Sequence, residues 1–165
     1  MRQILSVLVN NQPRVLARVA SLIGQRNFNI ESISVGETEN PSFSRMVIVT
    51  RGDLATLNQI AKQLNKLIDV IQVEQLEKEQ AVERELMLVK VEAPPSRRAE
   101  ITGIIEPFRA SVVDVGPQSL VIQVTGEVSK LEAMLELLRP YSILEVARTG
   151  ITAVSRGSSQ KAAVS

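Results

Sequence analysis

Apolar positions in residues 1–76 follow two periods, one typical of strands and one typical of helices. Runs rich in β-branched residues predict strands at residues 3–9, 30–35, 45–50 and 70–76. The apolar faces of two predicted helices are Val15, Leu16, Val19, Leu22 and Ile23 in the first and Leu54, Leu57, Ile60, Ala61, Leu64, Leu67 and Ile68 in the second. Asp53 is a suitable N-cap for the second helix. The order of elements is therefore β-α-β-β-α-β.

The same order repeats in the second half of the chain. Strands are predicted at residues 84–92, 111–115, 120–125 and 143–148, with helices over residues 96–105 and 128–138. Pro107 requires the first of these helices to end early or to kink, and Pro140 stops the second. Residues 77–83 are polar without a period, which predicts a linker.

These patterns predict an α+β protein made of two ferredoxin-like units. We expect domains at residues 1–76 and 84–154, joined by a linker at 77–83, with a disordered tail at 155–165. In such a unit the helices cover one face of the sheet. The other face carries Val and Ile, so we expect it to be buried against a second domain or a second copy. The pattern thus favours a homodimer.

Composition excludes several classes of function. The 165 residues include no cysteine and no histidine, which removes disulfides, thiolate nucleophiles, imidazole bases and the usual zinc or iron ligands. The formal charge of +1 with interspersed signs, and the scarcity of aromatic residues, argue against nucleic acid as a partner. No apolar run approaches the roughly 18–20 residues of a membrane span, so we expect no membrane contact and a cytoplasmic location.

Candidate catalytic groups are few. Glu83 and Glu85 flank Arg84 where the linker meets a strand, a position where carboxylates are mostly solvated or paired with lysine rather than used in acid–base chemistry. The nucleotide-binding patterns G-x-x-x-x-G-K-[ST] and G-x-G-x-x-G are both missing from the sequence. An independent enzyme is therefore disfavoured.

Two asparagines lie at the ends of the first predicted helix. At Asn11 an apolar strand breaks and restarts as a helix, whose first-turn N–H groups suit a carboxylate or a phosphate. Asn29 follows the other end of the helix, so one chain does not bring the two together. If two copies pair, both amides converge across the interface and suit a free amino acid. The alternative is that both asparagines are only turn and cap residues.

Several segments resemble one known family in order along the chain. They are residues 11–16 (NQPRVL), 26–33 (RNFNIESI), 44–46 (SRM), 62–70 (KQLNKLIDV), 82–91 (VERELMLVKV), 108–115 (FRASVVDV) and 145–150 (EVARTG). The chain resembles the regulatory subunit of acetohydroxyacid (acetolactate) synthase, whose N-terminal unit is an ACT domain.

This resemblance implies a non-catalytic subunit that activates a separate catalytic subunit in branched-chain amino-acid synthesis and confers feedback inhibition by valine. It implies that thiamine diphosphate, FAD and Mg belong to the catalytic partner and that this chain binds no cofactor. It also implies a homodimer with the effector at the interface between ACT domains. The implied effector-binding residues are Asn11, Gln12, Pro13, Arg14, Val15 and Leu16 of one chain and Asn29 and Ile30 of the other.

Arg14 departs from the family pattern, which usually has glycine at this place. If the position needs a positive φ, a residue with a side chain costs about 1–2 kcal/mol there. Alternatively, the arginine points outward or pairs with the effector carboxylate. We hypothesise that Arg14 weakens valine sensitivity and leaves activation intact. The sequence does not distinguish valine from leucine or isoleucine, and it leaves open a stand-alone amino-acid-sensing ACT module that regulates another enzyme or transcription.

Overall fold

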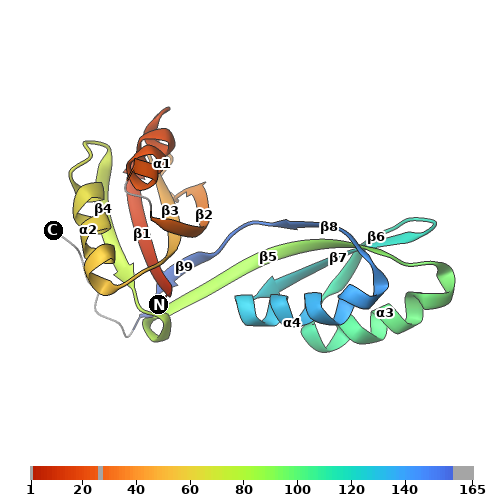
Figure 1. The fold of residues 1–165 in the computed structure, drawn as a ribbon. Coiled ribbons are helices and arrows are strands. Elements are labelled where there is room, and N and C mark those ends of the chain that lie inside the picture. Colours follow the sequence, from red (N-terminus) through yellow and green to blue (C-terminus); the bar gives the residue numbers. More distant parts are fainter. Residues whose placement is uncertain (1, 26–27, 158–165) are drawn as a thin grey trace. The chain divides into compact units, whose positions relative to one another are not determined.

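The computed structural model describes residues 2–25 and 28–157, which divide into two compact units. The first unit contains the residues up to Val82 together with those from Ile151 on, and the second contains Glu83–Gly150 (Figure 1). Within the described residues, no helix is both long enough and apolar enough to span a membrane.

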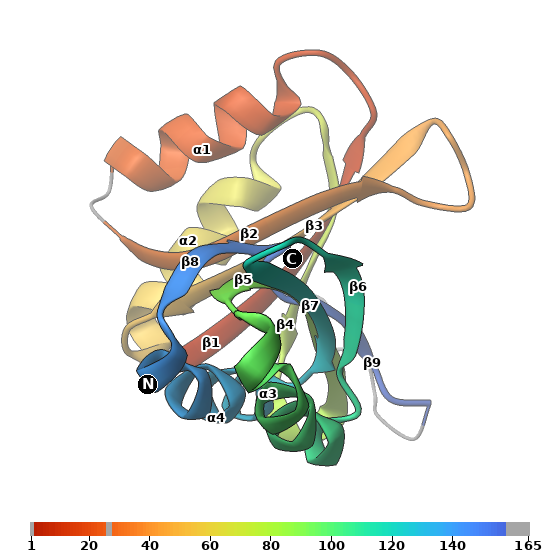
Figure 2. The same ribbon diagram turned by 90° about the vertical axis from the view of Figure 1, so that its right-hand side faces the viewer.

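The first unit has the predicted β-α-β-β-α-β order. Its elements are β1 (Arg2–Asn10), α1 (Val15–Gln25), β2 (Asn29–Glu37), β3 (Phe43–Arg51), α2 (Leu54–Asn65) and β4 (Val70–Leu76). The strands form an antiparallel sheet in the order β2-β3-β1-β4, so that β2 and β4 are its edges. Figure 2 shows α1 and α2 on the same side of this sheet. The ferredoxin-like prediction is confirmed for this unit.

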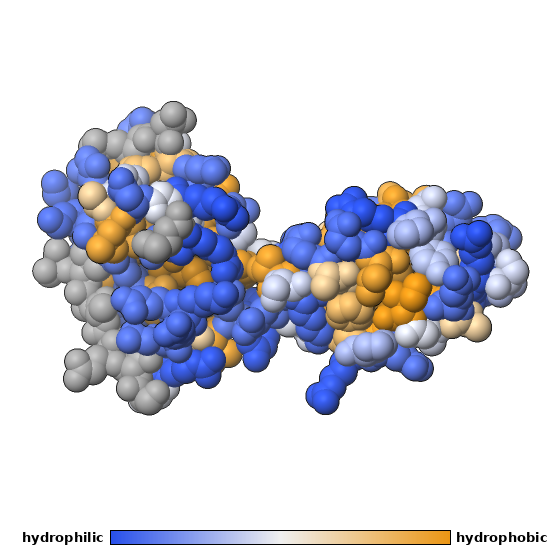
Figure 3. All heavy atoms as spheres, turned by 60° about the horizontal axis from the view of Figure 1, so that its bottom comes forward, coloured by the Kyte–Doolittle hydropathy of each residue, from blue (hydrophilic) through white to orange (hydrophobic). Residues whose placement is uncertain are grey.

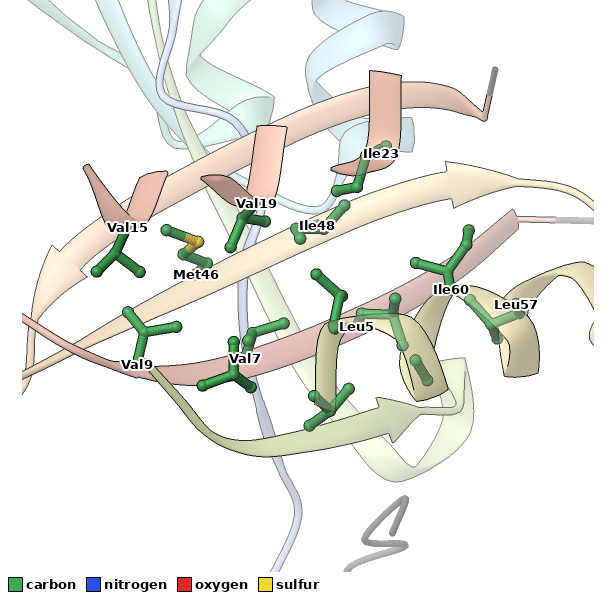
Figure 4. Close-up of a cluster of buried hydrophobic side chains, with 14 residues drawn as sticks. Leu5, Val7, Val9, Val15, Val19, Ile23, Met46, Ile48, Leu57 and Ile60 are labelled. Atoms are coloured by element: carbon green, nitrogen blue, oxygen red, sulfur yellow. The ribbon is translucent and has the colours of Figure 1, made fainter. Parts of the chain in front are cut away.

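The core of the first unit lies between the helices and the sheet. Val15, Val19 and Ile23 are spaced by four residues, so they form one face of α1, and all three are buried. They point toward Met46 and Ile48 of β3 (Figure 4). Because aromatic residues are scarce, these aliphatic contacts fix the position of α1 on the sheet.

Helix α2 is shorter than predicted. It ends at Asn65, where the backbone N–H of Lys66 donates to the carbonyl of Gln63 in a tight turn. The helical face was predicted to continue through Leu67 and Ile68, which is wrong because the chain must turn here to enter β4. Leu67 still packs against the core, whereas Ile68 is 90% exposed.

Asp53 caps α2 as predicted. Its Oδ1 accepts a hydrogen bond of 2.7 Å from the backbone N–H of Thr56. Hydrogen bonding by the side chain and then by the backbone N–H of Thr56 lowers the pKa of Asp53 below its ordinary value. The ionised carboxylate therefore stabilises the start of the helix.

The cap makes a pH-dependent contribution to stability. A carboxyl whose pKa is lower in the folded state stabilises the fold above its unfolded pKa, about 3.9, and loses this effect as the pH falls through the folded value. We expect Asp53→Ala to lower the free energy of unfolding at pH 7, and the difference from the native chain to shrink below about pH 4. Urea unfolding followed by circular dichroism measures this difference. A difference that stays constant down to about pH 2 would contradict a role for the ionised cap.

The second unit repeats the architecture. Its elements are β5 (Ala81–Glu92), α3 (Arg98–Ile105), β6 (Ser111–Val115), β7 (Ser119–Gly126), α4 (Val128–Leu138) and β8 (Ile143–Arg148), with short 3-10 turns at Lys78–Gln80, Pro95–Arg97, Glu106–Phe108 and Arg139–Tyr141. The sheet order β6-β7-β5-β8 matches that of the first unit. Helix α3 ends two residues before Pro107, as predicted. Figure 3 shows hydrophobic residues among hydrophilic ones on the surface of each unit.

The boundaries between the units differ from the prediction. The expected linker at 77–83 is a 3-10 turn that leads directly into β5 at Ala81. The expected C-terminal domain at 84–154 ends earlier, because the residues from Ile151 on belong to the first unit. There the chain forms β9 (Thr152–Ser155), which pairs with β5. The expected tail at 155–165 also starts too early, since the N–H of Arg156 donates to the carbonyl of Gln80, and residues 158–165 lie outside the described residues.

The returning segment lies on the sheet face that was expected to be open. The hydroxyl of Ser34 donates to the carbonyl of Ile151 at 2.9 Å, and the N–H of Ile151 donates to Ser32 Oγ at 3.5 Å. Ser32 and Ser34 pair with Val49 and Val47, which alternate with the core-facing residues of β3. The chain therefore covers part of this face itself, and the uncovered face no longer argues for a second copy.

Candidate functional site

Asn11 lies at the end of the sheet where α1 begins. Its backbone N–H donates to the carbonyl of Ser42, and its Nδ2 donates to Pro41 O at 3.0 Å and to Glu37 Oε1 at 3.1 Å. These bonds hold the loop of residues 11–14 against the hairpin between β2 and β3. The Oδ1 of Asn11 accepts no hydrogen bond from the described residues, and it remains available to a donor from outside.

The loop leads into α1 through an unusual backbone conformation. Arg14 has φ = +79°, in the left-handed region that favours glycine, and its carbonyl accepts the N–H of Arg18. The N–H groups of Leu16 and Ala17 belong to the first helical turn and have no partner within the described part of the chain. They provide donors for an anionic group at the end of the loop.

The eight predicted effector-binding residues fall into two separate groups. Gln12, Pro13, Arg14 and Leu16 are exposed beside Asn11, whereas Val15 is buried in the core. Asn29 and Ile30 begin β2 at the opposite end of the sheet. Because Asn10 pairs with Phe43 and Asn29 pairs with Arg51, the groups lie at opposite ends of β3, roughly 25 Å apart. One chain does not bring them together, as the topology predicts.

Strand β2 connects the two groups. It is an edge strand that starts at Asn29 and ends at Glu37, the residue whose carboxylate accepts from Asn11. No sequence pattern identified Glu37 as part of the site. The period of β2 gives no signal for its contact with Asn11, because this contact depends on how the loop packs on the hairpin.

The acidic residues of the second unit have a structural explanation. Glu85 is 6% exposed, and both of its oxygens accept from Arg148, at 2.8 and 3.2 Å. Hydrogen bonding with Glu85 raises the pKa of Arg148, and Nη1 of the same arginine donates to Glu132 on α4 at 2.6 Å. The expectation of a solvated or lysine-paired carboxylate is wrong for Glu85, because an arginine 63 positions later in the chain reaches it on the neighbouring strand.

A metal site is not formed by the described residues. In residues 2–25 and 28–157, no group of three or more His, Cys, Asp or Glu side chains is arranged to hold a metal ion. The chemistry available near Asn11 and Asn29 is hydrogen bonding by amides, backbone N–H groups and one carboxylate, which suits binding of a small polar ligand.

Comparisons with known proteins agree on one family. The family model described as the small subunit of acetolactate synthase matches residues 84–157, and the AHAS small subunit-like ACT domain matches residues 5–72. The chain is 52% identical to the acetolactate synthase small subunit of Bacillus subtilis, covering 98% of this chain and 95% of that protein. It is 55% identical to the probable acetolactate synthase small subunit of Methanothermobacter thermautotrophicus, covering 94% and 93%.

A solved structure shows the same fold. The acetolactate synthase small subunit from Thermotoga maritima superposes with a TM-score of 0.89 at 42% identity, covering 94% of this chain and 98% of that one. The family models for the two parts of the sequence and the solved structure thus indicate the same family. The chain belongs to the acetolactate synthase small-subunit family, and its first unit is an ACT domain.

Proposed function

We propose that this chain is the regulatory subunit of acetolactate synthase, which activates a separate catalytic subunit and confers feedback inhibition by valine. The family relationship supports a role beside a catalytic subunit. The hydrogen bond between Asn11 and Glu37 supports effector binding most directly, because it holds the loop before α1 at the end of the edge strand β2.

In this proposal two copies share each effector site. The outer edge of β2 carries backbone groups that pair with no strand of the described chain, so a second β2 can pair with it. Two-fold symmetry makes that pairing antiparallel, which brings the start of one β2 to the end of the other. Asn29 and Ile30 of one copy then lie beside Glu37, and hence beside Asn11, of the other. The unpaired edge of β2, rather than the open face of the sheet, therefore supports a homodimer in this proposal.

The shared pocket matches the groups of an amino acid. The N–H groups of Leu16 and Ala17 suit the α-carboxylate, and Asn11 Oδ1 with the carboxylate of Glu37 suits the ammonium group. The branched aliphatic side chain of such an effector would contact Ile30 of the partner copy. An extra methylene in an apolar pocket changes affinity by about 1–3 kcal/mol, so the choice among branched-chain amino acids is made by the fit of this side chain.

The chemical step belongs to the catalytic subunit in this proposal. Thiamine diphosphate, FAD and Mg are held there, and the small subunit acts in the cytoplasm by binding and by changing the activity of its partner. This chain contributes no catalytic group.

Reconstitution of the enzyme tests the proposed function. Purified chain is added to the isolated catalytic subunit of the same organism, and acetolactate formation is measured with and without valine. We expect the chain to raise the rate and valine to reverse that increase. Valine binding without activation would instead indicate a stand-alone sensing module, and the absence of both effects would reject the proposal.

A further inference from the structure

A groove runs along the helical side of the first unit. It lies between α1 and the loop of residues 66–69 that follows α2, and its volume is about 480 Å³. Ala17, Leu22 and Leu67 are the apolar residues of its lining, and Arg14 and Arg18 are the charged ones. The residues come from one unit, so the groove does not depend on the rest of the chain.

Ile68 extends this apolar surface into solvent. At 90% exposure it is the most exposed of the large hydrophobic residues in the described chain. It follows Leu67, which lines the groove, and it lies outside the core because α2 ends at Asn65. A single exposed aliphatic residue is common on protein surfaces, but one that adjoins an apolar groove enlarges the apolar patch, and large exposed patches often mark contact surfaces.

The charge around the groove is positive. Arg14 and Arg18 line it, and the loop of residues 66–69 carries the exposed Lys66 and the carboxylate of Asp69. Asp69 pairs with Arg18 at 2.9 Å, so this carboxylate does not neutralise the charges of Arg14 and Lys66. A segment that buries apolar side chains here gains affinity if it also carries acidic residues.

Two other surfaces of the first unit are separate from the groove. The edge of β2 suits pairing with a second copy, and residues 151–153 lie on the sheet face opposite the helices. The groove and Ile68 thus offer an apolar surface on the helical side that neither feature occupies. We infer that this surface docks an acidic, apolar segment of the catalytic subunit, an inference that rests on the proposed function.

The position of the groove also links docking to effector binding. The N–H of Asn10 donates to the carbonyl of Asp69 at 2.8 Å, and the Asp69 carboxylate pairs with Arg18 on α1. The loop of residues 66–69 is therefore tied to the chain on both sides of residues 11–16. An effector that binds residues 11–16 acts on one wall of the docking groove, so the two binding events are coupled if the effector favours one arrangement of this loop.

Two matched variants test the docking surface. Ile68→Glu places a negative charge next to Leu67, which lines the groove, and because the Ile68 side chain is exposed the fold is retained. Leu54→Glu is the control, since Leu54 is 54% exposed at the other end of α2, about 20 Å away along the helix. We expect Ile68→Glu to weaken binding of the catalytic subunit at least about tenfold and Leu54→Glu to change it less than about twofold.

Calorimetric titration of each variant into the catalytic subunit measures this affinity, and light scattering records the size of the small subunit alone. Lys66→Ala should reduce the dependence of binding on salt. Equal affinities for the native chain and Ile68→Glu would overturn the inference while activation by the native chain upholds the proposed function. A change in self-association with unchanged affinity for the catalytic subunit would show that a second copy occupies the groove, and would also overturn it.

Discussion

Asn29→Ala is expected to retain activation of the catalytic subunit and to lose valine inhibition, with the half-inhibitory valine concentration rising about 10- to 100-fold. A hydrogen bond to a charged ligand group contributes about 1.5–3 kcal/mol, which corresponds to this change. The fold is retained because the Asn29 side chain is exposed and its strand pairs with β3 through the backbone. Asn11→Ala should have the same effect on valine.

The control for these variants is Gln59→Ala, which removes an exposed amide from α2. Its valine inhibition should match that of the native chain. The rate of acetolactate formation against valine concentration measures all three variants in the reconstituted enzyme. Native valine sensitivity in Asn29→Ala would remove this residue from the effector site.

Arg14→Gly is expected to stabilise the first unit and to tighten valine binding. The structure places Arg14 at φ = +79°, a conformation that costs a residue with a side chain about 1–2 kcal/mol. Glycine removes this strain but makes the unfolded chain more flexible, so the net gain in the free energy of unfolding is about 1 kcal/mol. If strain draws the loop away from its binding conformation, removing it raises valine affinity by about tenfold.

A second strained arginine provides the control. Arg109 has φ = +54° at the end of the 3-10 turn before β6, in the second unit. Arg109→Gly should relieve similar strain without changing valine binding. Calorimetry on the isolated small subunit measures valine affinity for both variants. Equal, tight valine binding by the native chain and Arg14→Gly would contradict the hypothesis that Arg14 weakens sensitivity.

The backbone also bears on the effect that we expect of Arg14. Arg14 adopts a positive φ, and it lines the groove together with Arg18 and Leu67. Strain in the loop is the physical basis that we propose for the expected effect on valine.

Local sequence patterns predicted the strands and helices whose ends are marked by turn residues or by proline. Strands β4 and β8 occupy the predicted residues, 70–76 and 143–148, and α3 stops before Pro107. Helix α2 was predicted too long because Leu67 and Ile68 continue its apolar spacing, and only the turn into β4 ends it. Periodicity detects a face but does not show where tertiary packing requires the chain to leave the helix.

The unit boundaries were harder to predict because the evidence for them is long-range. The sequence at the start of β5 resembles a polar linker because it contains Glu83 and Glu85. In the structure both residues are buried. The pairing of Glu85 with Arg148 accounts for the burial of Glu85. The return of Ile151 to Ser32 and Ser34 joins residues more than 110 positions apart, and no local pattern predicts it.

The sequence predicted where the asparagines of the candidate site lie on the sheet, but it did not predict the contacts that link them to other elements. Helix and strand order placed Asn11 and Asn29 at opposite ends of the sheet, as the structure has them. The contacts of Asn11 with Glu37, and of Asn10 with Asp69, depend on packing between elements. In the proposed arrangement, the first contact links the loop to the strand edge that a second copy pairs with, and the second links the chain before the loop to the proposed docking groove.

Mixing two defective copies tests the shared effector site most directly. Asn11→Ala and Asn29→Ala homodimers should each bind valine about 10- to 100-fold more weakly than the native protein, so that neither has sites of native affinity. After subunit exchange in an equimolar mixture, a hybrid dimer has one site with both asparagines intact, so calorimetry should detect roughly a quarter of the native number of sites. A mixture that binds no more valine than the two variants measured separately would contradict a pocket built from residues 11–16 of one copy and Asn29 of the other.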